Sequence, residues 1–479
     1  MNQMSLFSET LSEYIKTKKI KIYQIANLTG IDRTWIQKMI TGKRKPSDKS
    51  QVLNLSRALS LTHSETEHLI NTYYILEMGE ENWKRRQIIQ KLIQSFHLDE
   101  NPLHISYPSS EFFLSKCCDT KILHTTININ RALHSILLQE SVNPNGFVKM
   151  FVQPDYSFIL NCLTAIDFEH ISIEHFLCLD SAPSQEIANL ETIRQIVPLL
   201  LSCKNYVPYG YYDHTKSIFS SSIFLPNTIL TSQYMVQISS DYTEAIITNH
   251  PDLLSLCHKY FEIQKNSSWP IFQPIKSFEE YLHLMLSETP PSVSYCIMDH
   301  PCVLSFLSLD IIQRVLNFSL VEPTVFNQLQ AHFQNFSDTP ISTYSFFSME
   351  GLRKFSESGV FTEVPLKFYS PLNSQETRYL IQRIVSFTES GYYHPRIFHP
   401  VGFKIPENLC VGTTSRQKAI IIFNHPQKGF LAFDVKNLSL SSAIYDFMEY
   451  IQSEKNMTYS EEESSRIIHD FLENTKLTN

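Results

Sequence analysis

Residues 22–47 of the chain read IYQIANLTGIDRTWIQKMITGKRKPS, which predicts two short helices separated by a tight turn. Gly30 suits the turn because glycine adopts positive φ angles at little cost. Asp32 is a good N-cap for a second helix over residues 33–41, and Gly42 suits the end of that helix. The stretch therefore predicts a compact pair of helices.

The helical character extends outward over residues 5–75. Apolar residues recur at helical spacing in each segment, and Thr62 with Glu65 fits the capping box of a fifth helix. The apolar stripes include Leu6, Leu11, Tyr14, Ile25, Ile36, Met39, Val52, Leu55, Leu69 and Tyr73. We expect an all-α N-terminal domain of five short helices over residues 1–76.

Several independent spacings in this domain agree with one another. An apolar–Ala pair precedes the turn, a glycine forms it, a β-branched residue follows, and the next helix ends in G-K-x-x-P; the residues are Ile25, Ala26, Gly30, Ile31, Gly42, Lys43 and Pro46. In these features the domain resembles the helix-turn-helix of the Cro/C1 (XRE) family. The resemblance implies a DNA-binding fold, double-stranded operator DNA as a partner and binding as a homodimer.

The helix over residues 33–41 then lies in the major groove, with its N-terminal residues nearest the base edges. Arginine and lysine can bind guanine, and glutamine can bind adenine. The expected base contacts are Arg33, Thr34, Gln37 and Lys38. The expected phosphate contacts are Tyr23, Gln24, Lys43, Arg44 and Lys45. The alternative is a helical protein-interaction module with an incidental basic loop.

Charge is distributed unevenly along the chain. The net charge is −8, whereas residues 1–50 carry +6, with eight Lys and two Arg against two Glu and two Asp. The remaining residues carry −14. A small basic head on a large acidic body indicates that the head is the part that meets a polyanion.

Composition excludes several classes of site. The chain has only 11 glycines, and it contains no G-x-G-x-x-G, G-x-x-x-x-G-K-[ST] or G-x-S-x-G motif. Its nine cysteines form no C-x-x-C pair, which favours reduced thiols in a cytoplasmic protein. We find no basic leader with an apolar stretch and no uncharged apolar run long enough to span a bilayer. We expect no membrane association, no metal and no cofactor.

Histidines are common enough, at 18, for chance pairings. His394 and His399 flank Pro395, and His300 lies two residues from Cys302, but neither spacing is a zinc signature. We interpret these histidines as structural or surface residues. The sequence predicts no catalytic residue and hence no enzyme.

Residues 77–104 predict a linker helix, with Ile88, Ile89, Leu92 and Ile93 on one side. This helix either packs on the body or carries a dimer contact.

The body reads as mixed α/β with a weak internal repeat. Strand, helix, aromatic stretch and paired strands recur in the same order, with offsets of 186 from Tyr206 to Tyr392 and 180 from Pro226 to Pro406. The pattern favours two related sensor or effector lobes, at 105–275 and 336–479, joined by a helical connector at 276–335. Strand-like segments and the absence of a 34-residue period exclude tetratricopeptide repeats.

The sequence as a whole favours a sequence-specific, DNA-binding transcription regulator. Its C-terminal region would sense a signal, such as a small-molecule or peptide effector, or bind a partner. One alternative is an enzyme with a regulatory DNA-binding head, although the body offers no nucleophile, metal or phosphate motif. The other is a phage-related or defence-type effector or scaffold whose head autoregulates its own expression.

Overall fold

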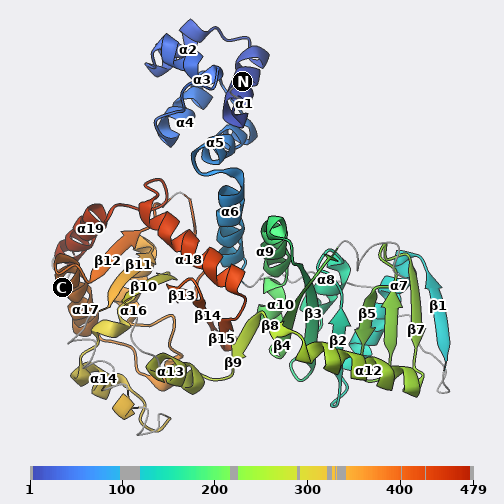
Figure 1. Ribbon diagram of the computed structural model, residues 1–479. Coiled ribbons are helices and arrows are strands. Elements are labelled where there is room, and N and C mark those ends of the chain that lie inside the picture. Colours follow the sequence, from blue (N-terminus) through green and yellow to red (C-terminus); the bar gives the residue numbers. More distant parts are fainter. Residues whose placement is uncertain are drawn as a thin grey trace. The chain divides into compact units, whose positions relative to one another are not determined.

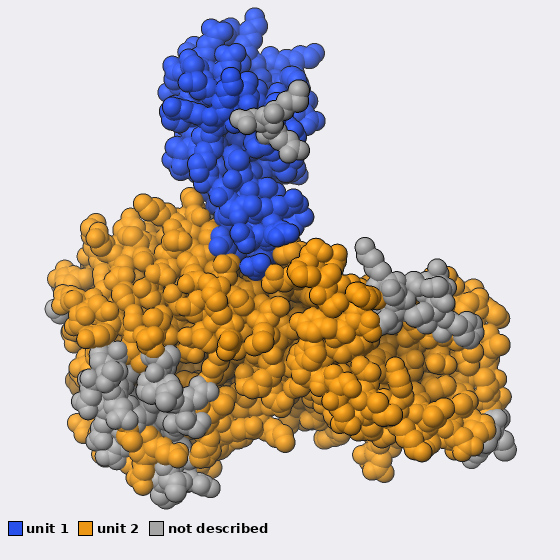
Figure 2. Space-filling model, viewed as in Figure 1, with its two compact units in different colours: residues 1–87 blue, residues 88–479 orange. Residues whose placement is uncertain are grey.

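The computed structural model describes residues 4–97, 119–215, 225–287, 292–320, 326–328, 331, 341–400, 402–426 and 428–474. The chain divides into two compact units, residues 1–87 and 88–479 (Figure 2). Helices come first and a mixed α/β body with two mixed sheets follows, which confirms the coarse order predicted from the sequence. In the ranges just given, no helix combines the length and apolarity needed to cross a bilayer.

The first unit is helical (Figure 1). Its helices are α1 (Leu6–Thr17), α2 (Ile22–Thr29), α3 (Arg33–Ile40), α4 (Lys49–Ala58) and α5 (His63–Met78). Helix α6 (Glu80–Gln94) follows and continues into the second unit.

Local sequence signals set the ends of the head helices as predicted. Gly30 ends α2 with a φ of 70°, a conformation that glycine adopts without strain. The Asp32 side chain caps α3, and Thr62 with Glu65 forms the capping box of α5. The core of the head is built from buried residues of all five helices, among them Phe7, Leu11, Ile25, Ile36, Met39, Val52, Leu55 and Leu69.

The first half of the body is built on a sheet of order β1-β7-β6-β5-β2-β3-β4-β8. Its strands are β1 (Thr120–His124), β2 (Phe147–Phe151), β3 (Ser172–Asp180), β4 (Tyr206–Asp213), β5 (Asn227–Leu230), β6 (Met235–Ile238), β7 (Glu244–Thr248) and β8 (Trp269–Pro270). Its helices are α7 (Thr126–Ser141), α8 (Ser157–Ala165), α9 (Glu186–Gln195), α10 (Val197–Ser202) and α12 (Pro251–Asn266). Strands β2, β3 and β4 are parallel, and the others pair antiparallel.

The second half is built on a sheet of order β12-β11-β10-β13-β14-β15-β9. Its strands are β9 (Phe272–Ile275), β10 (Val293–Met298), β11 (Ser342–Phe347), β12 (Tyr393–Ile397), β13 (Leu409–Ser415), β14 (Lys418–His425) and β15 (Gly429–Val435). Its helices are α13 (Phe278–Ser287), α14 (Leu309–Val315), α16 (Met349–Ser358), α17 (Ser374–Glu389), α18 (Leu438–Ser453) and α19 (Glu461–Asn474). Here β10, β11 and β12 are the parallel strands.

The two sheets have corresponding strand orders. The run β7-β6-β5-β2-β3-β4 matches β15-β14-β13-β10-β11-β12, and β1 or β9 pairs antiparallel with the first strand of the run. The first sheet has one strand more, β8, which pairs antiparallel with β4. The offsets noted in the sequence fall at matching places. Tyr206 begins β4 and Tyr392 precedes β12, while Pro226 and Pro406 precede β5 and β13.

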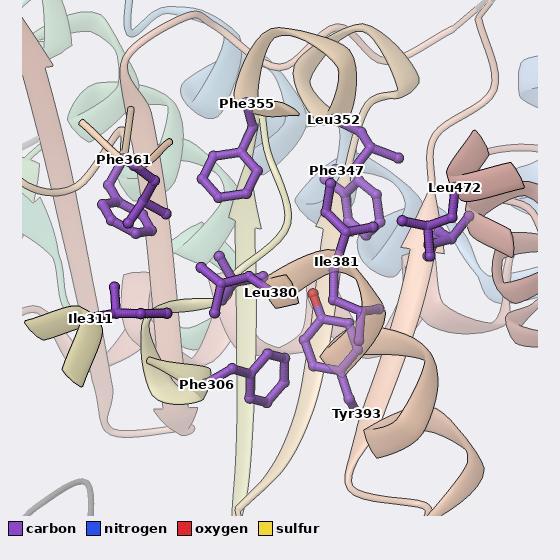
Figure 3. Packing of buried hydrophobic residues seen from close by; sticks show 14 of the residues in the cluster. Phe306, Ile311, Phe347, Leu352, Phe355, Phe361, Leu380, Ile381, Tyr393 and Leu472 are labelled. Carbon is purple, nitrogen blue, oxygen red and sulfur yellow. The ribbon is translucent and has the colours of Figure 1, made fainter. Parts of the chain in front are cut away.

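Helices cover the second sheet and close its core. Helices α17 and α19 pack on β12, and α18 packs on β13, β14 and β15. Figure 3 shows the cluster in which side chains from β11, β12, α16, α17 and α19 meet. Its members include Phe347, Leu352, Phe355, Leu380, Ile381, Tyr393 and Leu472.

One expectation about the body needs correction. The connector at 276–335 was expected to be helical, yet it contains β10, which lies inside the second sheet between β11 and β13. The strand consists of a short apolar run, VSYCIM, and periodicity alone does not distinguish such a run from a buried helical turn. The expected start of the first lobe, at residue 105, lies outside the described residues.

Candidate functional sites

Helix α3 carries a polar face opposite its packed face. Ile36 and Met39 are fully buried in the head core. The side chains expected to contact bases, Arg33, Thr34, Gln37 and Lys38, are all exposed. The start of the helix is fixed because Asp32 Oδ1 accepts hydrogen bonds from the Thr34 and Trp35 backbone N–H groups, at 2.8 and 3.1 Å. The bonds from Trp35 and Thr34 also lower the pKa of Asp32.

Three of the residues expected to contact phosphates follow the end of α3. Lys43, Arg44 and Lys45 are exposed. The Arg44 guanidinium lies 4.2 Å from the centre of the Trp35 ring, and Lys45 Nζ lies 2.9 Å from Glu77 Oε2. Because both contacts are at the surface, they cost little to exchange for a phosphate contact.

The other two expected phosphate contacts lie at the start of α2. Tyr23 and Gln24 are exposed. Gln24 Oε1 accepts a hydrogen bond of 2.9 Å from the Lys21 backbone N–H. This bond holds the Gln24 side chain against the helix start and leaves its amide N–H groups as donors.

The second sheet brings together a serine, a histidine and a glutamate that the sequence did not connect. Ser342 Oγ lies 3.0 Å from His394 Nε2, and His394 Nδ1 lies 2.9 Å from Glu461 Oε2. Ser342 begins β11, His394 lies in β12, and Glu461 opens α19. With Nδ1 protonated, His394 donates to Glu461 and accepts from the serine hydroxyl, which is the arrangement of a nucleophile, a base and an orienting carboxylate.

Neighbouring side chains hold this Ser–His–Glu cluster in place. The Tyr344 ring stacks on the His394 ring, with centroids 4.2 Å apart and planes 15° from parallel. Arg396 Nη2 lies 3.9 Å from Glu461 Oε2. The His394 and Glu461 side chains are 16% and 30% exposed, so the cluster is accessible from solvent.

The sequence analysis missed the cluster and treated His394 as a structural or surface residue. Its members are 52 and 67 residues apart in the chain. The only local signal was a histidine near the start of a strand, which is not specific. The parallel pairing of β11 with β12 and the packing of α19 on β12 supply the proximity.

A second cluster includes His300, which follows the C-terminal end of β10, and Glu363. Glu363 is 2% exposed, and its Oε2 lies 3.4 Å from His300 Nε2. His300 Nε2 accepts a hydrogen bond of 2.8 Å from the Thr362 backbone N–H, and Nδ1 lies 2.7 Å from the Pro301 carbonyl. Burial acts to lower the pKa of His300, but Glu363 outweighs it, so the pKa is raised.

The buried His175 of the first sheet has two hydrogen-bond partners. His175 is fully buried, with Nδ1 2.8 Å from the Tyr206 hydroxyl and Nε2 2.7 Å from the Val152 carbonyl. Burial lowers its pKa to about 4. Within the described ranges, no group of three or more His, Cys, Asp and Glu side chains could hold a metal ion.

Comparisons with known proteins give only distant likenesses. No family model matches the chain, and no curated protein matches it. One similar solved structure is phosphatidylserine synthase from Haemophilus influenzae, at 9% identity and a TM-score of 0.25, covering 82% of this chain and 97% of that one. Another is polyphosphate kinase from Porphyromonas gingivalis, at 11% identity and a TM-score of 0.22, covering 74% of this chain and 56% of that one.

These likenesses are too low to indicate a reaction or a substrate for this chain. Both neighbours are nevertheless enzymes, and neither is a transcription regulator. This finding contradicts our predictions of a transcription regulator, of a defence-type effector or scaffold, and of a chain that is not an enzyme. Those predictions are withdrawn. They rested on the contiguous motif of the head, whereas the polar clusters of the body are assembled from residues that are far apart in the sequence.

Proposed function

We propose that residues 5–78 form a helix-turn-helix domain that binds double-stranded DNA as a homodimer. The observation that carries the proposal is the exposed face of α3, where Arg33, Gln37 and Lys38 lie opposite the buried Ile36 and Met39. Such a helix can enter the major groove while its other face stays packed. The proposal concerns binding alone and includes no role in transcription.

Changes on α3 are expected to alter sequence preference. Arg33→Ala and Gln37→Ala should each cost about 1–3 kcal/mol on a preferred duplex and little on unrelated duplexes, because they remove hydrogen bonds to base edges. The preferred duplex is obtained by selection from a randomised pool with the full-length protein. Affinities are then measured by fluorescence anisotropy. Equal losses on all duplexes would contradict the placement of α3.

A change at Lys43 is expected to act differently. Lys43→Ala should weaken binding to every duplex and reduce the slope of log affinity against log salt by about 1, because one phosphate contact is lost. The matched control is Lys404→Ala, which removes an exposed lysine of the body. An unchanged salt slope in Lys43→Ala, or the same change in Lys404→Ala, would count against the interface.

We further propose that the body hydrolyses an ester or a related acyl compound at Ser342. The observation that carries this proposal is the Ser342–His394–Glu461 geometry, with its distances of 3.0 and 2.9 Å. The proposal does not draw on the distant structural neighbours.

The reaction follows from the protonation pattern of the cluster. His394 Nε2 takes the Ser342 hydroxyl proton while Oγ bonds to the carbonyl carbon, and the leaving alcohol departs with that proton. Water then attacks the acyl group and gives a proton to His394. The acid is released, and Oγ recovers the proton. Glu461 holds the Nδ1–H group and stabilises the imidazolium that forms in each half-reaction.

Covalent labelling tests this assignment directly. A fluorophosphonate probe reacts with serines whose hydroxyl is activated by a neighbouring base, so we expect the full-length protein to be labelled at Ser342. Peptide mass spectrometry identifies the modified residue. Ser342→Ala should lose the label and Ser390→Ala, at the exposed end of α17, should keep it. Folded protein that is not labelled at Ser342 would refute the proposal.

A further inference from the structure

A cavity of about 180 Å³ lies under the second sheet. Its wall is largely apolar and includes Met298, Leu304, Ile420 and Ile422. Three thiols also line it, from Cys296, Cys302 and Cys410. Thr343 lines it as well, and Thr343 alternates with Ser342 along β11. The cavity therefore lies on the opposite face of the sheet from Ser342 and His394.

One polar group in this cavity has no hydrogen-bond donor. Both carboxylate oxygens of Glu363 are buried and without a hydrogen-bond partner among the described residues. Glu363 lines the cavity together with Tyr281. A buried carboxylate without donors is strongly unfavourable, so such a group is usually paired.

His300 forms an ion pair with Glu363 but donates no hydrogen bond to it in this geometry, and Lys418 also lines the cavity. His300 Nε2 is the atom that faces Glu363, but its lone pair accepts the Thr362 backbone N–H. A proton on Nε2 would point into that N–H group. The Nε2 lone pair is therefore taken by the Thr362 N–H group, Nδ1 faces the Pro301 carbonyl, and neither oxygen of Glu363 receives a hydrogen bond from the ring.

We propose that the cavity binds a small primary amine whose ammonium group donates hydrogen bonds to Glu363 and whose apolar part fills the thiol-lined space. A cavity of about 150 Å³ in another protein accommodates benzene, so this one has room for a single ring with a short amine arm. The ammonium supplies the hydrogen-bond donors that Glu363 lacks. The inference stands apart from the DNA-binding and hydrolytic proposals, since it uses none of their residues.

Benzylamine is the probe that matches this chemistry, and benzyl alcohol is its neutral counterpart of nearly the same shape. In calorimetric titrations of the full-length protein, we expect benzylamine to bind at least tenfold more tightly than benzyl alcohol. Glu363→Gln should remove that preference and leave binding of benzyl alcohol unchanged. Glu389→Gln, on the exposed end of α17, is the matched control and should behave as the wild type.

Thiol protection gives a second readout that needs no variant. Cys302 lines the cavity and is partly exposed, whereas Cys257 is partly exposed in α12 and does not line it. Benzylamine should slow alkylation of Cys302 by N-ethylmaleimide at least threefold and leave Cys257 unchanged, as followed by peptide mass spectrometry. Equal binding of the amine and the alcohol, or no protection of Cys302, would overturn the proposal and indicate that His300 neutralises Glu363 alone.

Discussion

Full-length protein carrying Ser342→Ala is expected to hydrolyse a p-nitrophenyl ester about 10³-fold more slowly than the wild type, or slower still. The substitution removes the atom that bonds to the carbonyl carbon, and Ser342 carries the hydroxyl group that is hydrogen-bonded to His394 among the described residues. Loss of a catalytic nucleophile typically reduces turnover by three or more orders of magnitude. The measurement is kcat with saturating ester, and Ser390→Ala serves as the control.

The double variant shows whether the cluster acts as a unit. His394→Ala should reduce kcat about as much as Ser342→Ala, and the double variant should lose little more, because removing either member disables the same step. Glu461→Gln should also lower kcat, since an amide cannot stabilise the imidazolium as a carboxylate does. Losses that multiply in the double variant would mean that Ser342 and His394 act independently.

Acidification from pH 7.5 to 5.0 is expected to cost the body about 2 kcal/mol of unfolding free energy through His175 alone. Burial depresses its folded-state pKa to about 4, below the ordinary value of 6.5. The unfolded chain therefore takes up a proton as the pH falls below about 6.5, while the folded protein does not until about pH 4. The contribution of neutral His175 to the free energy of unfolding is therefore complete above about pH 6.5 and decreases as the pH falls from there toward about 4.

Urea denaturation of the full-length protein, followed at both pH values, measures this loss. His175→Gln should be less stable at pH 7.5, because packing and hydrogen bonds to Tyr206 and Val152 are disturbed, but it should lose about 2 kcal/mol less on acidification. The exposed His170 provides the control His170→Gln. His300, whose pKa is raised, contributes to the pH dependence of stability with the opposite sign. Because the wild type and His175→Gln both contain His300, its contribution cancels when the two are compared. An unchanged pH dependence in His175→Gln would contradict the assignment.

The head shows how far sequence reasoning can reach. Its helix ends depend on contacts between residues three or four apart, such as Asp32 with Trp35 and Thr62 with Glu65. Its buried face follows from the 3.6-residue period, and Ile36 and Met39 are buried as that period predicts. The base and phosphate contacts remain predictions, but their exposure agrees with the roles expected for them.

The strands of the body and their order could not be predicted from local sequence patterns alone. A short apolar run such as residues 293–298 reads equally as strand or helix until its neighbours β11 and β13 are known. The weak repeat was visible in the sequence as a repeated order of segments. The matching strand orders of the two sheets were not, because they depend on which strands become neighbours.

The sequence by itself determined the helical head, the polar face of α3 and the mixed α/β character of the body, because short-range periodicity and capping encode these features. Only the tertiary structure brought Ser342 to His394 and Glu461, and only it placed Glu363 in a thiol-lined cavity. Parallel strands pair through crossovers of many residues, so the side chains that meet across them share no spacing in the sequence.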